Sequence, residues 1–215
     1  MKTFNNIDFS IYKQEFLEKL GNINTWPEIP GVCGPGYPNN SIFMSEALVI
    51  YTLCKEFNID LLLESGVFRG GSTRIWSNIL YDIDIKCVDI LEEPKHHKIV
   101  HRVIDSLKEQ TNIEFHIGDG IQLLPEIIKN NKDKKIGVFV DGPKDNVGKS
   151  LCEKTLTYDN VYFACLHDYT DLCNEHEFST ASDPNFQSNN SDLDINHPQK
   201  STYPQGPGLW CKIKK

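Results

Sequence analysis

Short apolar segments alternate with amphipathic segments over most of this chain, and this alternation limits the folds that it can adopt. Between the apolar segments, hydrophobic residues recur at helical spacing, as in residues 42–57 and in STRIWSNIL. Near-continuous apolar strands separated by such helices are typical of a sheet covered on both faces, since right-handed crossovers place helices on each side. The expected strands are IDLLLE, IKCVDI, IEFHIGD, KIGVFVD and VYFACLHD. We therefore predict a doubly wound α/β fold with a mostly parallel sheet.

The chain divides into four stretches within one expected domain. Residues 1–41 form an N-terminal cap region and residues 42–169 hold the core. Residues 170–205 are rich in Asn, Ser, Asp and Pro and show no period. Structureless connections of this length are either functional lids or disordered insertions, and both alternatives stay open. Residues 206–215 contain LWCKI, which predicts a final antiparallel edge strand.

The charge and the cysteines limit the partners and the compartment. The net charge of -8 over 215 residues opposes attraction to phosphate backbones or anionic lipid, so we expect neither nucleic acid nor a membrane as partner. The seven cysteines include no C-x-x-C pair, and the N-terminus has no apolar run. These features predict reduced thiols, no signal peptide and a cytoplasmic location. We leave open whether the chain forms a homo-oligomer.

The segment LLLESGVFRGGST carries the strongest functional signal. Gly66 and Gly70 allow the backbone to turn sharply and to approach a ligand closely. Ser72 suits the N-cap of the following helix, whose free N–H groups favour an anion. A tight strand-to-helix turn without a ligand is the alternative. The segment therefore predicts a cofactor loop.

Acidic residues at two further strand ends strengthen this prediction. Asp89 ends IKCVDI about 20 residues after the glycines, where an acid accepts both hydroxyls of a ribose. Asp119 ends IEFHIGD, where an acid or the neighbouring backbone meets the amino group of an adenine ring. Either aspartate could instead be a helix N-cap. Since ligands of such folds bind at the carboxyl ends of the strands, we expect both acids to face one site.

Taken together, the motifs E-S-G-x-x-x-G-G-S, V-D-I and G-D-G-x-x-L-L-P resemble the class I S-adenosylmethionine-dependent methyltransferases, over roughly residues 42–170. The glycine spacing departs from the G-x-G-x-x-G of nicotinamide dehydrogenases. The resemblance implies that the methionine part of the cofactor lies by Glu64, Gly66 and Gly70, its ribose by Asp89 and its adenine by Asp119. We add Ser72, at the start of the helix, to this site.

Two further strand ends carry acidic and basic residues that are candidates for a catalytic or metal site. Asp141 in FVDGPK is followed three residues later by Lys144, and Asp168 in LHDY follows His167. Two carboxylates that converge repel each other unless a cation lies between them, and their oxygens suit Mg²⁺. Both acids could instead cap the helices that follow.

This second group is similar to that of metal-dependent small-molecule O-methyltransferases of the catechol type and of the macrolide and aminocoumarin sugar type. In those families D-x-x-K and a later acidic pair hold the metal and deprotonate the acceptor hydroxyl. His167 departs from that pattern, because a second Asp or Asn is usual there. It could be the general base, could indicate Mn²⁺ or Fe²⁺, or could mean that no metal binds.

We therefore expect an S-adenosylmethionine-dependent O-methyltransferase that acts on a hydroxyl of a small molecule or sugar. Lys144 or His167 would be the catalytic base, and Asp141 and Asp168 would hold Mg²⁺ or Mn²⁺. Metal-independent N-methylation and a non-catalytic binding module with the same fold are the alternatives. Three histidines of the expected helix over residues 92–110 (His96, His97 and His101) include a pair at metal-binding spacing, but we interpret them as a solvated helix face.

Overall fold

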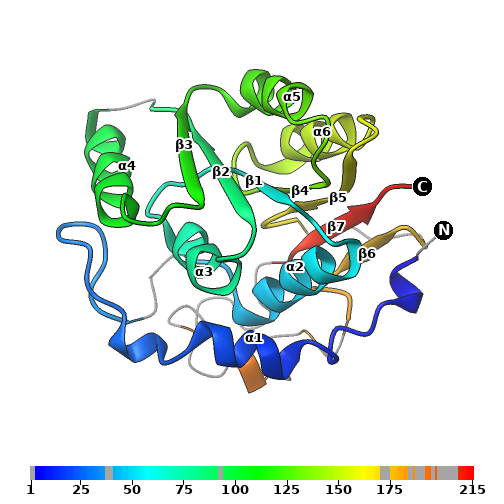
Figure 1. Cartoon of the computed structure of the whole chain (residues 1–215), viewed down its shortest axis with the longest axis horizontal. Helices are drawn as coiled ribbons and strands as arrows, with labels where there is room; N and C mark the ends of the chain where they lie inside the picture. The colour runs from blue at the N-terminus through cyan, green and yellow to red at the C-terminus, as the bar shows by residue number, and fades with distance from the viewer. Residues whose placement is uncertain are drawn as a thin grey trace.

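The computed structural model describes residues 3–36, 41–91, 94–169, 175–183, 186, 192–194, 197 and 208–215. At its centre is a seven-stranded sheet with the order β3-β2-β1-β4-β5-β7-β6 (Figure 1). The strands are β1 (Leu61–Ser65), β2 (Asp84–Asp89), β3 (Ile113–Ile117), β4 (Ile136–Val140), β5 (Val161–Leu166), β6 (Glu177–Ser179) and β7 (Trp210–Ile213). Strands β1 to β5 pair in parallel, and β7 is antiparallel to its neighbours β5 and β6. The predicted α/β class, with a mostly parallel sheet and an antiparallel C-terminal strand, is confirmed.

Helices cover both faces of this sheet. The α-helices are α1 (Lys13–Leu20), α2 (Met44–Phe57), α3 (Gly71–Ile79), α4 (Pro94–Leu107), α5 (Gly120–Asn130) and α6 (Asp145–Thr155), and the 3-10 helices are η1 (Phe4–Asn6), η2 (Ile23–Thr25) and η3 (Asp192–Asp194). Figure 1 shows α5 and α6 on one side of the sheet and α2 and α3 on the other, with α1 outside them. Helix α4 is shorter than the expected range of 92–110.

The central strands explain why the apolar segments of the sequence are continuous. Strand β1 is buried along its whole length. Its Leu62 packs into the cluster formed with α2 and α3, while Leu61 and Leu63 pack into the cluster formed with α5 and α6. Because successive side chains point to opposite faces, a strand covered on both sides needs apolar residues at every position.

The N-terminal region packs on the outer side of α2. Phe16 of α1 is fully buried, and its ring centroid lies 5.8 Å from that of Tyr51 in α2. The Tyr51 hydroxyl donates a hydrogen bond of 2.7 Å to Glu15. Helix α2 is thereby enclosed between the sheet and the N-terminal region. The division of the chain into four stretches of one domain stays a prediction.

Two expectations about local structure are wrong. The segment 170–205, expected to lack secondary structure, contains β6 and η3, and β6 covers the open edge of β7 through the register Glu177↔Lys212. Ser72 is not the N-cap of α3, because the helix begins at Gly71 and Gly70 is its N-cap. The Ser72 hydroxyl donates to Glu64 instead.

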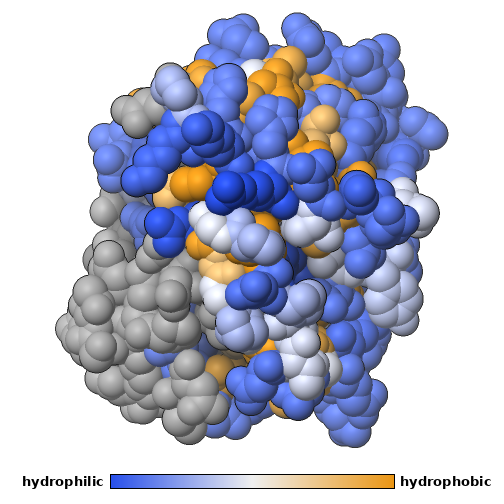
Figure 2. Space-filling model, turned by 90° about the vertical axis from the view of Figure 1, so that its left-hand side faces the viewer, coloured by the Kyte–Doolittle hydropathy of each residue, from blue (hydrophilic) through white to orange (hydrophobic). Residues whose placement is uncertain are grey.

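The exposed large hydrophobic side chains include Ile11 near α1, Val147 in α6, and Phe68 and Ile90, which line one cavity. Figure 2 shows a mostly hydrophilic face with small, separate hydrophobic areas among the described residues. Within the described part of the chain, none of the helices combines the length and the hydrophobicity needed to cross a membrane.

Candidate cofactor and catalytic site

A cavity of about 440 Å³ lies at the carboxyl ends of the central parallel strands. Its volume is within the usual range for small-molecule sites. The lining includes four residues predicted from the sequence to belong to the site, namely Gly66, Asp89, Asp119 and Asp141, together with Phe68, Ile90, His96 and Ile121. The acids at or just after the carboxyl ends of β2, β3 and β4 therefore line one space, as the parallel arrangement predicts.

Gly66 is required by the close approach of two strand ends. Its φ of +94° is unfavourable for other residues, and a Cβ atom there would lie 2.7 Å from the backbone nitrogen of Gly142. The carbonyl oxygen of Ser65 accepts hydrogen bonds from the backbone N–H of Asp141 and Gly142 at 2.7 and 3.0 Å. The first glycine of the loop thus lets the end of β1 contact the residues after β4.

Asp89 lies at the bottom of the cofactor loop and is 4% exposed. Its Oδ2 accepts hydrogen bonds from the backbone N–H of Val67 at 2.6 Å and of Phe68 at 2.9 Å. Its Oδ1 is buried and has no hydrogen-bond partner among the described residues. Because buried polar atoms are nearly always hydrogen-bonded, this oxygen suits a ligand hydroxyl such as that of a ribose.

Glu64 and Ser72 are not among the residues that line this cavity. Glu64 is fully buried and accepts hydrogen bonds from Ser72, from Thr73 at 2.6 Å, from Trp76 at 3.1 Å and from Cys87 at 3.2 Å. Burial, opposed in part by these donors, raises the pKa of Glu64 to about 7. Both residues hold α3 against β1 and β2 beneath the loop, and their contact with the cofactor stays a prediction.

Asp119 and Gly70 each have a structural role at the start of a helix, and Asp119 also lines the cavity. Asp119 is the N-cap of α5, where its side chain accepts from the backbone N–H of Ile121 at 2.9 Å, and it also lines the cavity. Gly70 has a φ of +69°, and a Cβ there would meet Val103 at 2.4 Å. Asp119 thus caps α5 and lines the cavity at the same time, and its contact with the cofactor stays a prediction.

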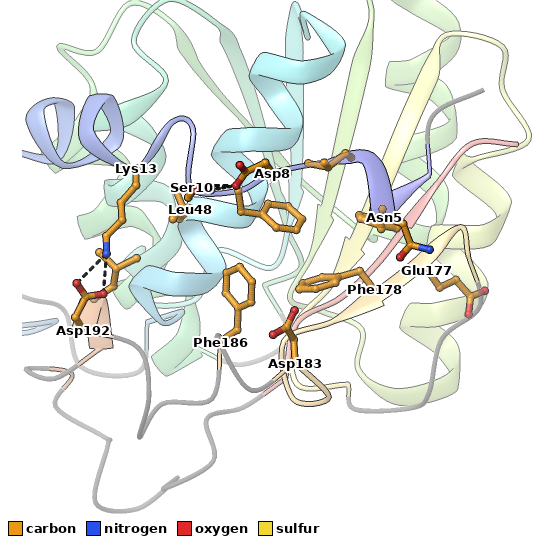
Figure 3. A pocket seen from close by; sticks show the side chains of 14 residues that line it. Asn5, Asp8, Ser10, Lys13, Leu48, Glu177, Phe178, Asp183, Phe186 and Asp192 are labelled. Atoms are coloured by element: carbon orange, nitrogen blue, oxygen red, sulfur yellow. Dashed lines mark hydrogen bonds and ion pairs between the residues drawn. The ribbon is translucent and has the colours of Figure 1, made fainter.

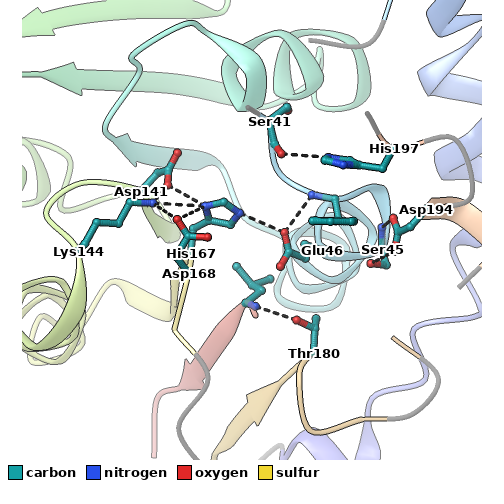
Figure 4. Close-up of polar contacts among 12 residues, drawn as sticks. Ser41, Ser45, Glu46, Asp141, Lys144, His167, Asp168, Thr180, Asp194 and His197 are labelled. Atoms are coloured by element: carbon teal, nitrogen blue, oxygen red, sulfur yellow. Dashed lines mark hydrogen bonds and ion pairs between the residues drawn. The ribbon is translucent and has the colours of Figure 1, made fainter. Parts of the chain in front are cut away.

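The second predicted group converges beside the cavity (Figure 4). The Lys144 ammonium forms ion pairs with Asp141 and, at 2.7 Å, with Asp168. His167 Nδ1 lies 2.8 Å from Asp141 Oδ1. Strands β4 and β5 are parallel neighbours, so the residues that follow them meet at one edge of the sheet. The expected convergence of these four side chains is present.

Glu46, which the sequence analysis missed, lies on the other side of His167. Its Oε2 is 3.3 Å from His167 Nε2 and also accepts the backbone N–H of Phe43 at 3.0 Å. Burial would lower the pKa of His167, but the carboxylates of Asp141 and Glu46 outweigh it and raise that pKa well above the usual value. His167 therefore lies between Asp141 and Glu46, whose negative charges favour its imidazolium form, while burial raises the pKa of Glu46 itself.

Lys144 carries a stable positive charge for the same reason. Burial opposes its ionisation, yet the neighbouring Asp141 and Asp168 raise its pKa above the usual value. For Asp141, burial favours the neutral acid, but the charges of His167 and Lys144 hold its pKa below the usual value. The charges of this group compensate one another.

Two residues from the segment 170–205 pack near Glu46. Asp194 accepts hydrogen bonds from the backbone N–H of Ser45, at 3.0 Å, and from its hydroxyl. The ring of His197 stacks on Phe43 at 3.8 Å, and burial lowers its pKa to about 4. A helix start with Glu at its third position was the available signal for Glu46, but Phe43 is not a usual capping residue.

Asp141, His167 and Asp168 together form a candidate metal site. Each offers one donor atom, and these atoms lie within 4.8 Å of one another. Two carboxylates and one imidazole suit Mn²⁺ better than Mg²⁺, since imidazole is a poorer ligand for magnesium. Lys144 Nζ pairs with both carboxylates and lies 3.5 Å from His167 Nδ1, so an ammonium already contacts the three donors.

A larger cavity of about 590 Å³ lies beside the N-terminal region and β6 (Figure 3). Its apolar part includes Phe178 and Phe186, whose rings contact each other at 5.4 Å. Lys13 and Asp192 form an ion pair of 2.8 Å at its rim. Since it shares no lining residue with the cavity at the strand ends, we do not assign the cofactor to it.

The order of the strands, the glycine loop and the acid after β2 define a class I methyltransferase fold, and solved structures share it. The O-methyltransferase TomG from Streptomyces achromogenes, in complex with S-adenosylmethionine, matches with a TM-score of 0.51 at 13% identity, covering 100% of both chains. The O-methyltransferase from Bacillus cereus, in complex with S-adenosylhomocysteine, matches with a TM-score of 0.50 at 15% identity, covering 83% of this chain and 84% of that one.

Among curated proteins, the chain is similar to the O-methyltransferase imqG of Aspergillus flavus. The two are 30% identical over 115 residues, which are 52% of this chain and 46% of that protein. The match thus spans about half the length of this relative. No protein-family model matches the chain. The resemblance to class I S-adenosylmethionine-dependent methyltransferases, predicted from the motifs, is confirmed.

Proposed function

We propose that this protein is an S-adenosylmethionine-dependent O-methyltransferase whose acceptor is a hydroxyl group of a small molecule or sugar. One observation carries the proposal: a single cavity is lined both by Asp89, whose Oδ1 forms no hydrogen bond among the described residues, and by Asp141 of the charged group. A cofactor with its ribose at Asp89 would thereby reach the charged side chains with its reactive end.

The six described cysteines are all free thiols, which supports the proposed cytoplasmic location.

The residues of the site fit this cofactor. Gly66 lines the cavity without a side chain, Asp89 offers an acceptor for a ribose hydroxyl, and Asp119 offers a second acceptor, which suits an adenine amino group. When bound, S-adenosylmethionine supplies a methyl group on a positively charged sulfur. The chain then has to hold an acceptor oxygen in line with that methyl group and to stabilise the charge that the oxygen gains as its proton leaves.

We assign the stabilising role to Lys144 and His167. Both are expected to be protonated near neutral pH, since the neighbouring carboxylates raise their pKa values. Two fixed cations beside an acceptor hydroxyl lower its pKa and stabilise the oxyanion. The proton would leave through Asp168, whose side chain is 45% exposed. Either cation would act as the base only after losing its own proton, which its carboxylate neighbours oppose.

Asp141, His167 and Asp168 would hold a divalent cation, with Mn²⁺ favoured over Mg²⁺, once His167 has lost its proton. When bound, such a cation would lower the pKa of an acceptor hydroxyl. Metal-independent methyl transfer is a second candidate, and the contacts of Lys144 with all three donor atoms favour it. In that case Lys144 and His167 provide the positive charge without a metal.

Two experiments test these proposals. S-adenosylmethionine should raise the melting temperature of the protein and NAD should not, because a ligand that binds only the folded state stabilises it. A response to NAD alone would contradict the proposed cofactor. For the metal, titration of Mn²⁺ followed by electron paramagnetic resonance should show one bound ion in the wild type and none in Asp168→Asn. Absence of binding in both would favour the metal-independent candidate.

The acceptor class is tested by screening hydroxylated small molecules and sugars, and matched amines, for release of S-adenosylhomocysteine. Turnover of hydroxyl compounds supports the proposal, and turnover of amines alone would contradict it. With an acceptor in hand, excess EDTA should abolish turnover if the metal is essential and leave it unchanged if Lys144 and His167 suffice.

A further inference from the structure

The first turn of α4 brings His96 into the cofactor cavity. His96 lines this cavity, and its Nε2 lies 3.2 Å from Asp89 Oδ1. The His96 side chain is 23% exposed, whereas that of Asp89 is 4% exposed. The expectation that His96 belongs to a solvated helix face is therefore wrong.

Both of these atoms are without a hydrogen bond within the described part of the chain. His96 Nε2 and Asp89 Oδ1 are buried, and their contact lacks the geometry of a hydrogen bond. Asp89 Oδ2, in contrast, is satisfied by two backbone N–H groups. Two adjacent polar side chains that line one cavity and lack hydrogen bonds between them are what a ligand with two neighbouring hydroxyls would complete.

Phe68 fixes the position of the His96 ring. The ring centroids lie 5.7 Å apart in an edge-to-face arrangement. Phe68 has a φ of +46°, which is unusual for a bulky residue, and its backbone N–H is held by Asp89. Its side chain is 43% exposed and also lines the cavity. Asp89, Phe68 and His96 thus form one connected wall.

We propose that His96 is a cofactor-binding residue that recognises the ribose diol together with Asp89. One hydroxyl donates to Asp89 Oδ1, and the adjacent hydroxyl pairs with His96 Nε2. An imidazole nitrogen donates or accepts according to its tautomer, so it suits a hydroxyl in either role. This inference rests on the proposed S-adenosylmethionine site and adds a residue to it.

The test is calorimetric titration of S-adenosylhomocysteine and of its 2′-deoxy and 3′-deoxy analogues. The variants are His96→Ala, His96→Gln, which keeps a polar group, and the control His101→Ala, which removes an exposed histidine of the same helix. His96→Ala should bind S-adenosylhomocysteine about 3- to 10-fold more weakly, as expected for one hydrogen bond. This loss should shrink for the analogue that lacks the hydroxyl paired with His96. His96→Gln should recover part of the affinity, and His101→Ala should match the wild type.

An unchanged affinity of His96→Ala, or an equal loss for S-adenosylhomocysteine and both deoxy analogues, would overturn the inference, because a merely structural role would affect all three ligands alike. A wild type that binds no S-adenosylhomocysteine would refute the proposed cofactor, and the inference with it. Circular dichroism verifies folding, and His96→Phe replaces His96→Ala if the alanine variant does not fold.

Discussion

The two halves of the strand-end site differ in how their polar groups are satisfied. Beside β1 and β2, Asp89 and His96 line the cavity, and their Oδ1 and Nε2 atoms form no hydrogen bonds among the described residues. Beside β4 and β5, the cations Lys144 and His167 pair with the carboxylates around them. The first half holds one histidine and one carboxylate 3.2 Å apart at the cavity wall, and a ligand can complete their hydrogen bonds. The second half holds fixed charges that can stabilise a change of charge during a reaction.

Removing the carboxylate of the first half should give the largest effect. Asp89→Ala should weaken binding of S-adenosylhomocysteine by roughly 100-fold or more, because two charge-assisted hydrogen bonds within the loop and the ribose contact are lost together. Calorimetric titration measures this loss, with the exposed Asp105→Ala of α4 as the control. An unchanged affinity would show that Asp89 only fixes the loop and that the half of the site beside β1 and β2 does not bind the ribose.

Glu64 supports the first half, and its ionisation should make stability depend on pH. Folding raises its pKa from 4.5 to about 7, so the folded state binds more protons than the unfolded state between these values. The contribution of Glu64 to stability is therefore fully present below pH 4.5 and is lost as pH rises through 7, by roughly 3 kcal/mol.

Urea unfolding between pH 5 and 8 tests this dependence, and Glu64→Gln should flatten the slope. The same decline in the wild type and in Glu64→Gln would assign it to another group. Because Glu64 holds α3 through Ser72 and Thr73, this test also measures how much the contact between β1 and α3 contributes to the free energy of unfolding.

In the second half, breaking the compensation of charge should cost stability. Asp141→Asn removes a counter-charge of both His167 and Lys144, and we expect a loss of roughly 2 kcal/mol, less than for a fully buried pair because the Asp141 side chain is 23% exposed. Asp168→Asn, at 45% exposure, should cost less than about 1 kcal/mol. Urea unfolding compares the two. Equal stabilities for Asp141→Asn and the wild type would mean that these charges do not compensate one another.

The smallest effect is expected at Asp119. Asp119→Ala removes the N-cap of α5 and should lower the free energy of unfolding by about 1 kcal/mol. Its effect on cofactor affinity should stay within about 10-fold, since at most one hydrogen bond to the adenine amino group is lost. Urea unfolding and calorimetry separate the two roles, and a large loss of affinity with unchanged stability would make Asp119 a ligand rather than a cap.

The sequence predicts the site best where neighbouring parallel strands determine it. Asp141 and Asp168 each follow one of two apolar segments that form the neighbouring parallel strands β4 and β5. The sheet therefore places the two residues close together, whatever rotamers their side chains adopt. Glu46 could not be found this way, since it reaches His167 from the start of a helix whose position depends on tertiary packing. The prediction that His96 lies on a solvated helix face was wrong for a physical reason. Helical spacing indicates which face of a helix meets the core, but it does not indicate that the first turn of that helix lines a cavity.

The central claim is that a cofactor bound at Asp89 presents its reactive end to the charges beside β4 and β5. A crystal structure with S-adenosylhomocysteine tests it most directly. The ribose hydroxyls should contact the Asp89 carboxylate, and the sulfur should point toward Asp141 and His167. A ligand bound in the cavity beside Phe178, or one with its sulfur turned away from Asp141, would contradict the claim.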